Sequence, residues 1–229
     1  MFDWSTIKAV SFDGDETLWN FQTAMREALQ KAVDTMRSEG LRRPDGDVSV
    51  EWLIEVRERL AALPKYGRTT MEGIRRAAFR EAVAQCGGDI ESADRLCDRY
   101  FDDRLSGQRL YDRTIETLES LAHNYSLALV TNGNTRPESM GLGERFDVVV
   151  TAAESGFVKP DSRIFGVAIE RLDVAPENCV HIGDHPVEDV AAAQNAGLRT
   201  IWLNRSGGES DVNIKPDAEI GRLPDLLSL

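Results

Sequence analysis

The sequence contains little cysteine and fewer basic than acidic residues, and each of these features excludes some classes of function. Its three cysteines among 229 residues, Cys86, Cys97 and Cys179, have no metal-ligand spacing and cannot all pair. We therefore expect reduced thiols in the core of a cytoplasmic protein. The 27 basic residues are outnumbered by 39 acidic ones, which gives a net charge of −12. This balance argues against general binding to nucleic acid or to a membrane surface.

Long apolar runs and several common catalytic motifs are also missing. No apolar run approaches the roughly 18 residues of a membrane span, and we expect no signal peptide because the N-terminus lacks a basic flank followed by an apolar stretch. The sequence contains no Gly-x-Ser-x-Gly motif, which would indicate a serine hydrolase. It also contains no Walker loop, which would indicate a nucleoside triphosphatase. The length is sufficient for one domain with a modest insertion.

A long helical block follows the first twenty residues. Apolar residues recur at helical spacing in four stretches up to residue 105, and Gly40, Pro64 and the pair Gly87-Gly88 separate these stretches. No strand pattern interrupts them. Four consecutive amphipathic helices can bury their apolar faces against one another. We therefore expect residues 20–106 to form a helical bundle inserted into the rest of the protein.

The remainder of the chain alternates between β-prone apolar runs and helical patterns. The runs cover 126–131, 148–151, 179–183 and 200–203, and helical patterns cover 115–123, 163–172 and 187–196. Such alternation is typical of βαβ units and a parallel sheet. The run at 8–12 belongs to the same sheet, so we predict an α/β fold with a Rossmann-like parallel sheet and helices on both faces. This core comprises residues 1–19 and 107–229, and its part from Ser206 onward has no assigned role.

Polar residues follow four of the predicted strands. Each group alone is ordinary loop chemistry, but the carboxyl ends of parallel strands meet in one crevice, where α/β proteins bind their ligands. The groups are Asp13-Gly14-Asp15, Thr131-Asn132-Gly133-Asn134, Lys159-Pro160-Asp161, and Gly183-Asp184 with Asp189.

These groups together suit the transfer of a phosphoryl group. Crowded carboxylates raise one another's pKa unless a positive charge lies between them, and Mg²⁺ prefers such oxygen ligands. A transferred phosphoryl group needs an in-line nucleophile and positive charge around its equatorial oxygens. The Thr131 hydroxyl and loop amides can donate to those oxygens, while Lys159 and a cation can neutralise their charge. Asp-Gly is also common in turns, so the first group alone leaves a simple turn open.

The ordered set of four motifs resembles the haloacid dehalogenase-like (HAD) hydrolase superfamily, in its branch with a helical cap inserted after the first motif. The sequence Asp13-Gly14-Asp15-Glu16-Thr17 is similar to the family's Asp-x-Asp-x-Thr motif. Val130 to Gly133 is similar to the second motif, Lys159-Pro160 to the third, and Gly183 to Asp189 to the fourth.

The resemblance implies covalent catalysis. Asp13 would attack phosphorus and form an aspartyl-phosphate, and Asp15 would protonate the leaving alcohol and then activate water. Thr131 would bind the phosphate and Lys159 would steady both Asp13 and the transferred group. The two residues that follow Thr131, Asn132 and Gly133, would contact the substrate.

The resemblance also implies a bound Mg²⁺. Its ligands would be Asp13, the backbone carbonyl of Asp15, and Asp184, with Asp189 in or near the coordination sphere. A carboxylate at the start of a helix, stabilised by the helix dipole, is the alternative interpretation of Asp189.

The acid at position 15 bears on the type of reaction. Family members that displace halide lack an acid at this position, because halide needs no proton, so Asp15 favours phosphomonoester hydrolysis. We predict a cytoplasmic Mg²⁺-dependent phosphatase for a nucleotide or sugar phosphate, monomeric or homodimeric, with no nucleic-acid or membrane partner. A phosphomutase, a 2-haloacid dehalogenase, a receiver-like signalling module and a binding protein with an inactive site remain alternatives.

Positive charge is concentrated in one part of the predicted cap. From Arg57 to Arg80 there are seven basic residues and two acidic ones. We hypothesise that the loop Lys65-Tyr66-Gly67-Arg68, and Arg68 in particular, attracts the phosphate of the substrate. The alternative is a solvated helix face.

Overall fold

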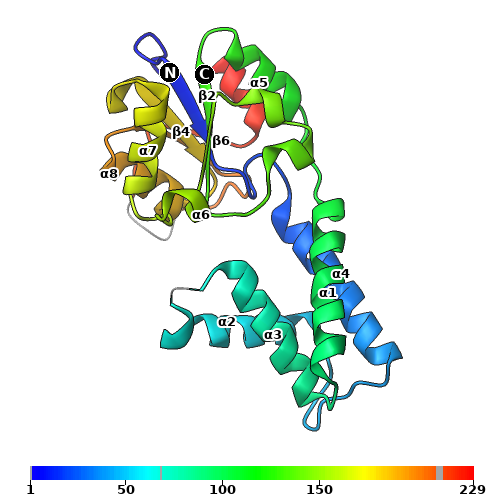
Figure 1. Cartoon of the computed structure of the whole chain (residues 1–229). Helices are drawn as coiled ribbons and strands as arrows, with labels where there is room; N and C mark the ends of the chain where they lie inside the picture. The colour runs from blue at the N-terminus through cyan, green and yellow to red at the C-terminus, as the bar shows by residue number, and fades with distance from the viewer. Residues whose placement is uncertain (1, 68, 210–213) are drawn as a thin grey trace. The chain divides into compact units, whose positions relative to one another are not determined.

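The computed structural model describes residues 2–67, 69–209 and 214–229. Its contacts divide the chain into two compact units. One unit, here called the α/β unit, comprises Met1–Asn20 and Arg109–Leu229, and the other, the helical unit, comprises Phe21–Gln108 (Figure 1). The sequence patterns had placed these two boundaries after residues 19 and 106.

The α/β unit contains one parallel sheet in the order β3-β2-β1-β4-β5-β6. The prediction of a parallel α/β fold is thereby confirmed. The short strand β6 was not predicted, because three residues are too few to show a period of two. The strands are β1 (Ala9–Phe12), β2 (Ser126–Thr131), β3 (Val148–Thr151), β4 (Cys179–Gly183), β5 (Arg199–Leu203) and β6 (Ala218–Ile220).

The central position of β1 determines where the site lies. Its residue Phe12 is in register with Leu129 of β2 on one side and with Ile182 of β4 on the other. The three strands are parallel, so the residues that follow them leave the same edge of the sheet side by side. The strand order changes direction at β1, because β2 lies on one side of it and β4 on the other. In α/β sheets the ligand crevice forms at the carboxyl ends of the strands where this change occurs.

Helices cover both faces of the sheet (Figure 1). Helix α5 and the 3-10 helix η6 lie together on one side, while α7 and α8 lie on the other. The helix predicted at 187–196 begins instead as a π-helical segment, η5, and continues as α8. The bounds are α5 (Thr114–Ala122), α6 (Ala152–Ser155), α7 (Arg163–Leu172), η5 (Pro186–Ala191), α8 (Ala192–Asn195) and η6 (Leu223–Ser228).

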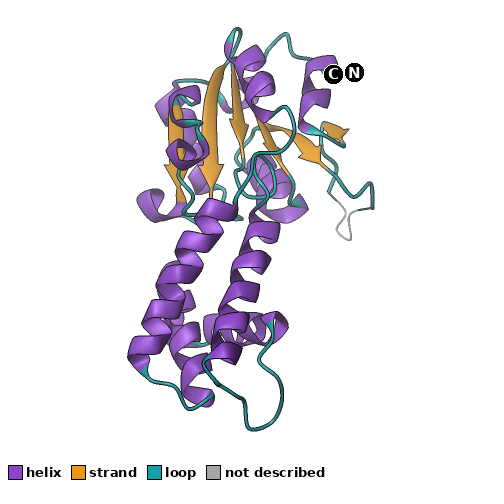
Figure 2. Ribbon diagram, turned by 90° about the vertical axis from the view of Figure 1, so that its right-hand side faces the viewer, coloured by secondary structure: helices purple, strands orange, loops and turns teal. Residues whose placement is uncertain are grey.

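The helical unit contains the four helices that the apolar spacing predicted (Figure 2). Helix α4 packs against both α1 and α3, and α2 packs against α3. Side-chain oxygens of Ser49, Thr70 and Asp89 accept hydrogen bonds from backbone N–H groups in the first turns of α2, α3 and α4. The bounds are α1 (Phe21–Ser38), α2 (Val50–Ala61), α3 (Met71–Gln85) and α4 (Ile90–Gly107). Among the described residues, no helix is both long and apolar enough to cross a bilayer.

The core of the helical unit predicts how it responds to truncation. Phe79 of α3 is 4% exposed within this core, whereas Ile90 at the start of α4 is 68% exposed. We expect Phe79→Ala to lower the free energy of unfolding by about 3–5 kcal/mol, because it leaves a cavity. Ile90→Ala is the matched control and should change it by less than about 0.5 kcal/mol. Urea titration followed by circular dichroism measures both, and equal losses would contradict the assignment of this core.

Candidate active site

Asp13 is the first residue after β1, and the sheet fixes its backbone. Its N–H donates to the carbonyl oxygen of Ile182 in β4 at 2.9 Å. The residue is only 6% exposed. Its carboxylate lies with those of Asp184 and Asp189, so that one ligand oxygen from each falls within 4.8 Å of the others. Three acids that are far apart in the sequence therefore meet at the carboxyl edge of the sheet.

A tight turn follows Asp13 and brings Asp15 beside it. The N–H of Leu18 donates to the carbonyl of Gly14 at 2.8 Å, and the N–H of Glu16 donates to the carbonyl of Trp19 at 2.8 Å. Glu16 has a φ of 61°, a left-handed conformation that few non-glycine residues adopt. The turn returns the Trp19 ring to Asp15, and the indole Nε1–H donates to Asp15 Oδ1 at 2.7 Å.

Lys159 lies between two of the buried carboxylates. Its Nζ is 2.6 Å from Asp13 Oδ1 and 2.6 Å from Asp189 Oδ1. Burial alone would lower the pKa of Lys159, but the two carboxylates outweigh burial and raise it, so the ammonium stays charged. For Asp189, burial acts to raise the pKa, but the charge of Lys159 prevails and lowers it. The pair Lys159 and Asp189 is therefore ionised inside the protein.

The side chain of Asn132 fixes the loop that carries Lys159. Its Oδ1 accepts from the backbone N–H of Lys159 at 2.7 Å, and its Nδ2 donates to the carbonyl of the same residue at 3.0 Å. Nδ2 also donates to Glu188 Oε2 at 3.0 Å. Asn132 thus joins the end of β2 to the lysine loop, a role that differs from the substrate contact expected of it. The substrate contact stays a prediction.

Gly133 lies against both Asp15 and Thr131. The Thr131 hydroxyl is buried at the end of β2, and its oxygen accepts from the N–H of Gly133 at 2.9 Å. A Cβ on residue 133 would lie 2.7 Å from Asp15 Oδ2, so any larger residue here would displace the Asp15 carboxylate. The second motif therefore meets the first at the Asp15 carboxylate.

The acid cluster has the composition of a divalent-cation site. Burial and the neighbouring carboxylates, despite the opposing charge of Lys159, raise the pKa of Asp13 well above its usual range. Burial, followed by the charge of Asp189, raises the pKa of Asp184 to about 6. Three carboxylates face one lysine, so a divalent cation would supply the missing positive charge. The residues present thus fit a metal ion of the kind that prefers oxygen ligands.

The three acids are not equivalent as ligands. Asp189 Oδ1 accepts from Lys159 and, at 3.4 Å, from His181 Nε2, while its Oδ2 accepts from the N–H of His185 at 2.9 Å. Asp184 instead accepts one side-chain hydrogen bond, from the Thr17 hydroxyl at 3.2 Å. Asp13 and Asp184 are therefore better placed to bind a cation, and Asp189 to orient Lys159.

Sequence reasoning missed two polar residues inside apolar strands. The Ser11 hydroxyl and His181 Nδ1 are 2.9 Å apart, and both residues are buried. Burial lowers the pKa of His181, so the ring is neutral, its Nε2–H donates to Asp189, and its Nδ1 accepts from Ser11. A hydrogen-bonded chain consequently runs from Ser11 through His181, Asp189 and Lys159 to Asp13. The signal in the sequence is a polar residue within each of two otherwise apolar strands.

Arg205 was also missed, and it fastens the turn after Asp13. Its guanidinium stacks 3.7 Å over the ring of Tyr111 and donates to the backbone carbonyls of Glu16 and Thr17. The Tyr111 hydroxyl donates to Glu16 Oε2 at 2.8 Å. No periodic pattern marks Arg205, which lies two residues after β5 and just before the part of the chain without an assigned role.

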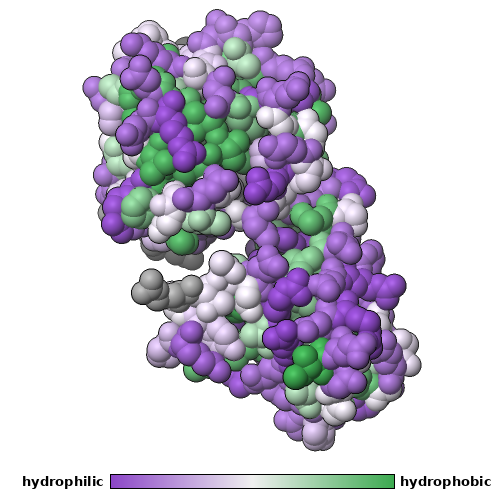
Figure 3. All heavy atoms as spheres, in the orientation of Figure 1, coloured by the Kyte–Doolittle hydropathy of each residue, from purple (hydrophilic) through white to green (hydrophobic). Residues whose placement is uncertain are grey.

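The basic segment of the helical unit is largely paired with acids. Arg59 pairs with Glu81, Arg76 Nη1 lies 2.8 Å from Asp98 Oδ1, and Arg80 Nε lies 2.8 Å from Asp94 Oδ1. These acids lie beyond residue 80 and so were not counted with the segment. Hydrophilic side chains also cover much of this unit in Figure 3. Arg68 lies outside the described residues, and its predicted role stays a prediction.

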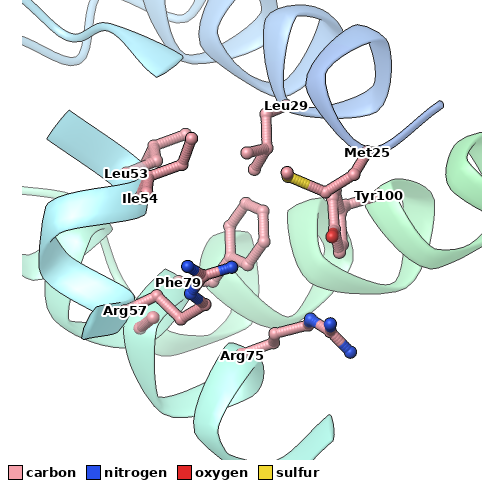
Figure 4. A pocket seen from close by; sticks show the side chains of 9 residues that line it. Met25, Leu29, Leu53, Ile54, Arg57, Arg75, Phe79 and Tyr100 are labelled. Atoms are coloured by element: carbon pink, nitrogen blue, oxygen red, sulfur yellow. The ribbon is translucent and has the colours of Figure 1, made fainter. Parts of the chain in front are cut away.

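The helical unit has a pocket of its own (Figure 4). Its lining is mostly apolar, and two arginine side chains border it. None of the predicted site residues that the structure describes lines it, neither those of the α/β unit nor those of the loop from Lys65 to Gly67. The lining residues are Met25, Leu29, Leu53, Ile54, Arg57, Arg75, Ala78, Phe79 and Tyr100.

Comparisons with known proteins agree with the site's composition. A family model of haloacid dehalogenase-like hydrolases matches residues 7–197. The chain is 30% identical over 236 residues to the glyceraldehyde 3-phosphate phosphatase of Methanopyrus kandleri, and the aligned residues cover 97% of each chain. It is 33% identical over 157 residues to the phosphoserine phosphatase of Thermus thermophilus, and the aligned residues cover 66% of this chain and 63% of that protein.

A solved structure is similar over nearly the whole length. The 2-haloacid dehalogenase from Pseudomonas syringae pv. tomato DC3000 superposes with a TM-score of 0.78 at 35% identity, covering 97% of both chains. The likeness therefore extends to a relative whose name denotes a different leaving group from that of the phosphatases.

The raised pKa of Asp184 predicts how cation binding depends on pH. A proton and a cation compete for this carboxylate, so the affinity for Mg²⁺ should rise as the pH increases through about 6. Isothermal titration calorimetry without substrate measures this, and buffers of different ionisation enthalpy report the proton released. Asp184→Asn should abolish binding, whereas the control Asp161→Asn should not. An affinity that stays constant between about pH 5 and about pH 7.5 would contradict the assignment.

Proposed function

The chain belongs to the haloacid dehalogenase-like hydrolases, and from that premise we propose that it is a Mg²⁺-dependent phosphatase acting on a small phosphomonoester. The observation that carries the proposal is the pairing of two acids at one strand end. Asp13 contacts the Lys159 ammonium, whose positive charge favours the anionic form that a nucleophile needs, and Asp15 follows two residues later, against Gly133.

In the first half-reaction, an Asp13 carboxylate oxygen attacks phosphorus. The bond from phosphorus to the leaving oxygen breaks, and Asp15 donates its proton to that oxygen, so that the alcohol leaves neutral. Lys159 neutralises part of the charge on the transferred group. A Mg²⁺ bound by Asp13, Asp184 and the Asp15 carbonyl would supply further positive charge at the phosphoryl oxygens.

In the second half-reaction, Asp15 acts as a base. It removes a proton from a water molecule as the water oxygen attacks phosphorus, and the bond from phosphorus to Asp13 breaks. Inorganic phosphate leaves, and both carboxyl groups return to their starting protonation. The Thr131 hydroxyl and the N–H groups after β2 would bind the phosphoryl oxygens in both steps.

The substrate class rests on the chemistry of the site and on relatives. The two phosphatases compared above are named for phosphoserine and glyceraldehyde 3-phosphate, which are small phosphorylated metabolites. We propose the same class for this chain, with a nucleotide or a sugar phosphate as candidates. Location in the cytoplasm and a monomeric or homodimeric state are part of the same proposal.

A 2-haloacid dehalogenase is the second candidate, favoured by the name of the P. syringae structure. The acid at Asp15 argues against it, since halide leaves without a proton. A phosphomutase would keep both acids. Product analysis separates the three, because they release inorganic phosphate, halide or an isomerised phosphate ester.

Removing the nucleophile tests the proposal. We expect Asp13→Asn to lower kcat for aryl phosphate hydrolysis by at least about a thousandfold, because an amide cannot form the acyl-phosphate. EDTA should abolish the activity of the unchanged protein. Asp161→Asn, which alters an acid paired with Arg163 in the lysine loop, is the control and should retain activity. An Asp13→Asn protein that stays fully active would overturn the proposed chemistry.

The predicted role of Arg68 requires a separate test. If this residue attracts the substrate phosphate, Arg68→Glu should raise KM for phosphorylated substrates while kcat changes little. Arg80→Glu, at a residue bound to Asp94, provides a charge-matched control. An unchanged KM in the Arg68 variant would remove this residue from the site.

A further inference from the structure

We propose that Trp19 is a positioning residue for Asp15, whose indole N–H fixes the carboxyl group in the orientation needed for proton transfer to the leaving group. The inference rests on the proposed function and adds to it a residue outside the four motifs. Trp19 itself would contact neither the substrate nor the cation.

The bond between the two side chains is short and rigidly supported. Trp19 Nε1 lies 2.7 Å from Asp15 Oδ1, and the Trp19 side chain is fully buried. Its ring packs directly on Gly14, where a Cβ would lie 2.5 Å from the ring atom Cζ2. Burial and this contact leave the ring no room to turn, so the position of the N–H is determined by packing.

The backbone of Trp19 is fixed as well. Its carbonyl accepts from the N–H of Glu16 at 2.8 Å, and Trp19 forms an isolated antiparallel bridge with Leu110. The N–H of Tyr111 donates to the carbonyl of Leu18 at 3.0 Å. The donor for Asp15 is thereby attached both to the turn and to the segment that precedes α5.

The second oxygen of Asp15 faces the phosphate-binding residues. A Cβ on Gly133 would lie 2.7 Å from Asp15 Oδ2 and 3.2 Å from the Thr131 hydroxyl oxygen. Trp19 thus contacts Oδ1, while Oδ2 is directed to the side where the phosphoryl group would bind. A general acid acts only within hydrogen-bond reach of the atom it protonates. Loss of the indole bond would remove the contact that holds Oδ1, so the carboxyl group would be held less firmly in that position.

The test must separate positioning from packing, since a large buried ring also stabilises the fold. Trp19→Phe keeps an aromatic ring at this position and removes the N–H. Its effect is measured with a series of aryl and alkyl phosphates whose leaving groups differ in pKa. An ester with a very acidic leaving group, such as 2,4-dinitrophenyl phosphate, needs no proton from Asp15, whereas phenyl and alkyl phosphates do.

We expect Trp19→Phe to lower kcat/KM for phenyl and alkyl phosphates by about 10–100-fold, and for 2,4-dinitrophenyl phosphate by less than about threefold. Trp202→Phe is the matched control, because it removes an indole N–H that donates to the backbone carbonyl of Asp184 at 2.8 Å. This control should alter all esters by the same factor. Equal losses across the series for Trp19→Phe, or no loss, would overturn the inference.

Two further measurements keep the outcome decisive. If Trp19→Phe fails to fold, benzothienylalanine at position 19 keeps the shape of the ring and lacks the N–H, and the same series applies. In an Asp15→Ala background, Trp19→Phe should have no additional dependence on the leaving group. If the unchanged protein hydrolyses no phosphomonoester with Mg²⁺, the proposed function falls and this inference with it, whereas an active protein with a flat series contradicts the inference alone.

Discussion

The buried ammonium group of Lys159 forms ion pairs with two carboxylates that follow different strands. The rest of the site is arranged around this group. The group is 3% exposed and lies 2.6 Å from both Asp13 and Asp189. Buried charges are tolerated only when they are paired and hydrogen-bonded, and removal of one partner leaves the others uncompensated. The pairing also orients Asp13, because one of its oxygens is bound by the lysine. The remaining excess of carboxylates at Asp13 and Asp184 is what a divalent cation would neutralise.

The order of the strands makes this meeting possible. Because β1 lies between β2 and β4, Asp13, Thr131 and Asp184 leave the same edge of the sheet from three adjacent strands. Lys159 comes from the loop after the next strand, and the Asn132 side chain attaches that loop to the end of β2. The backbone of the sheet thus brings the acids together, and a few side chains that bind backbone groups fix the lysine loop and the turn after Asp13. Asn132 and Arg205 perform this work without carrying the chemistry themselves.

The sequence was sufficient to predict the features that repeat or that follow a strand. Apolar spacing predicted the four helices and five of the six strands, and motif order predicted that Asp13, Lys159 and Asp184 would converge. Features that depend on single contacts could not be predicted. The three-residue strand β6 has no period, and the bond from Trp19 to Asp15 depends on a left-handed Glu16 in a tight turn. The partners of the basic segment were missed because Asp94 and Asp98 lie on a neighbouring helix.

The central claim is that Asp13 becomes covalently phosphorylated during turnover, and chemical trapping tests it most directly. An Asp15→Asn protein, which lacks the base for the second half-reaction, is mixed with an activated aryl phosphate and Mg²⁺, quenched in acid and digested. The account predicts that mass spectrometry finds one added phosphoryl group on the peptide that contains Asp13, and that borohydride converts this residue to homoserine. Phosphorylation of a different residue, or no labelled peptide while the aryl alcohol is still released, would contradict it.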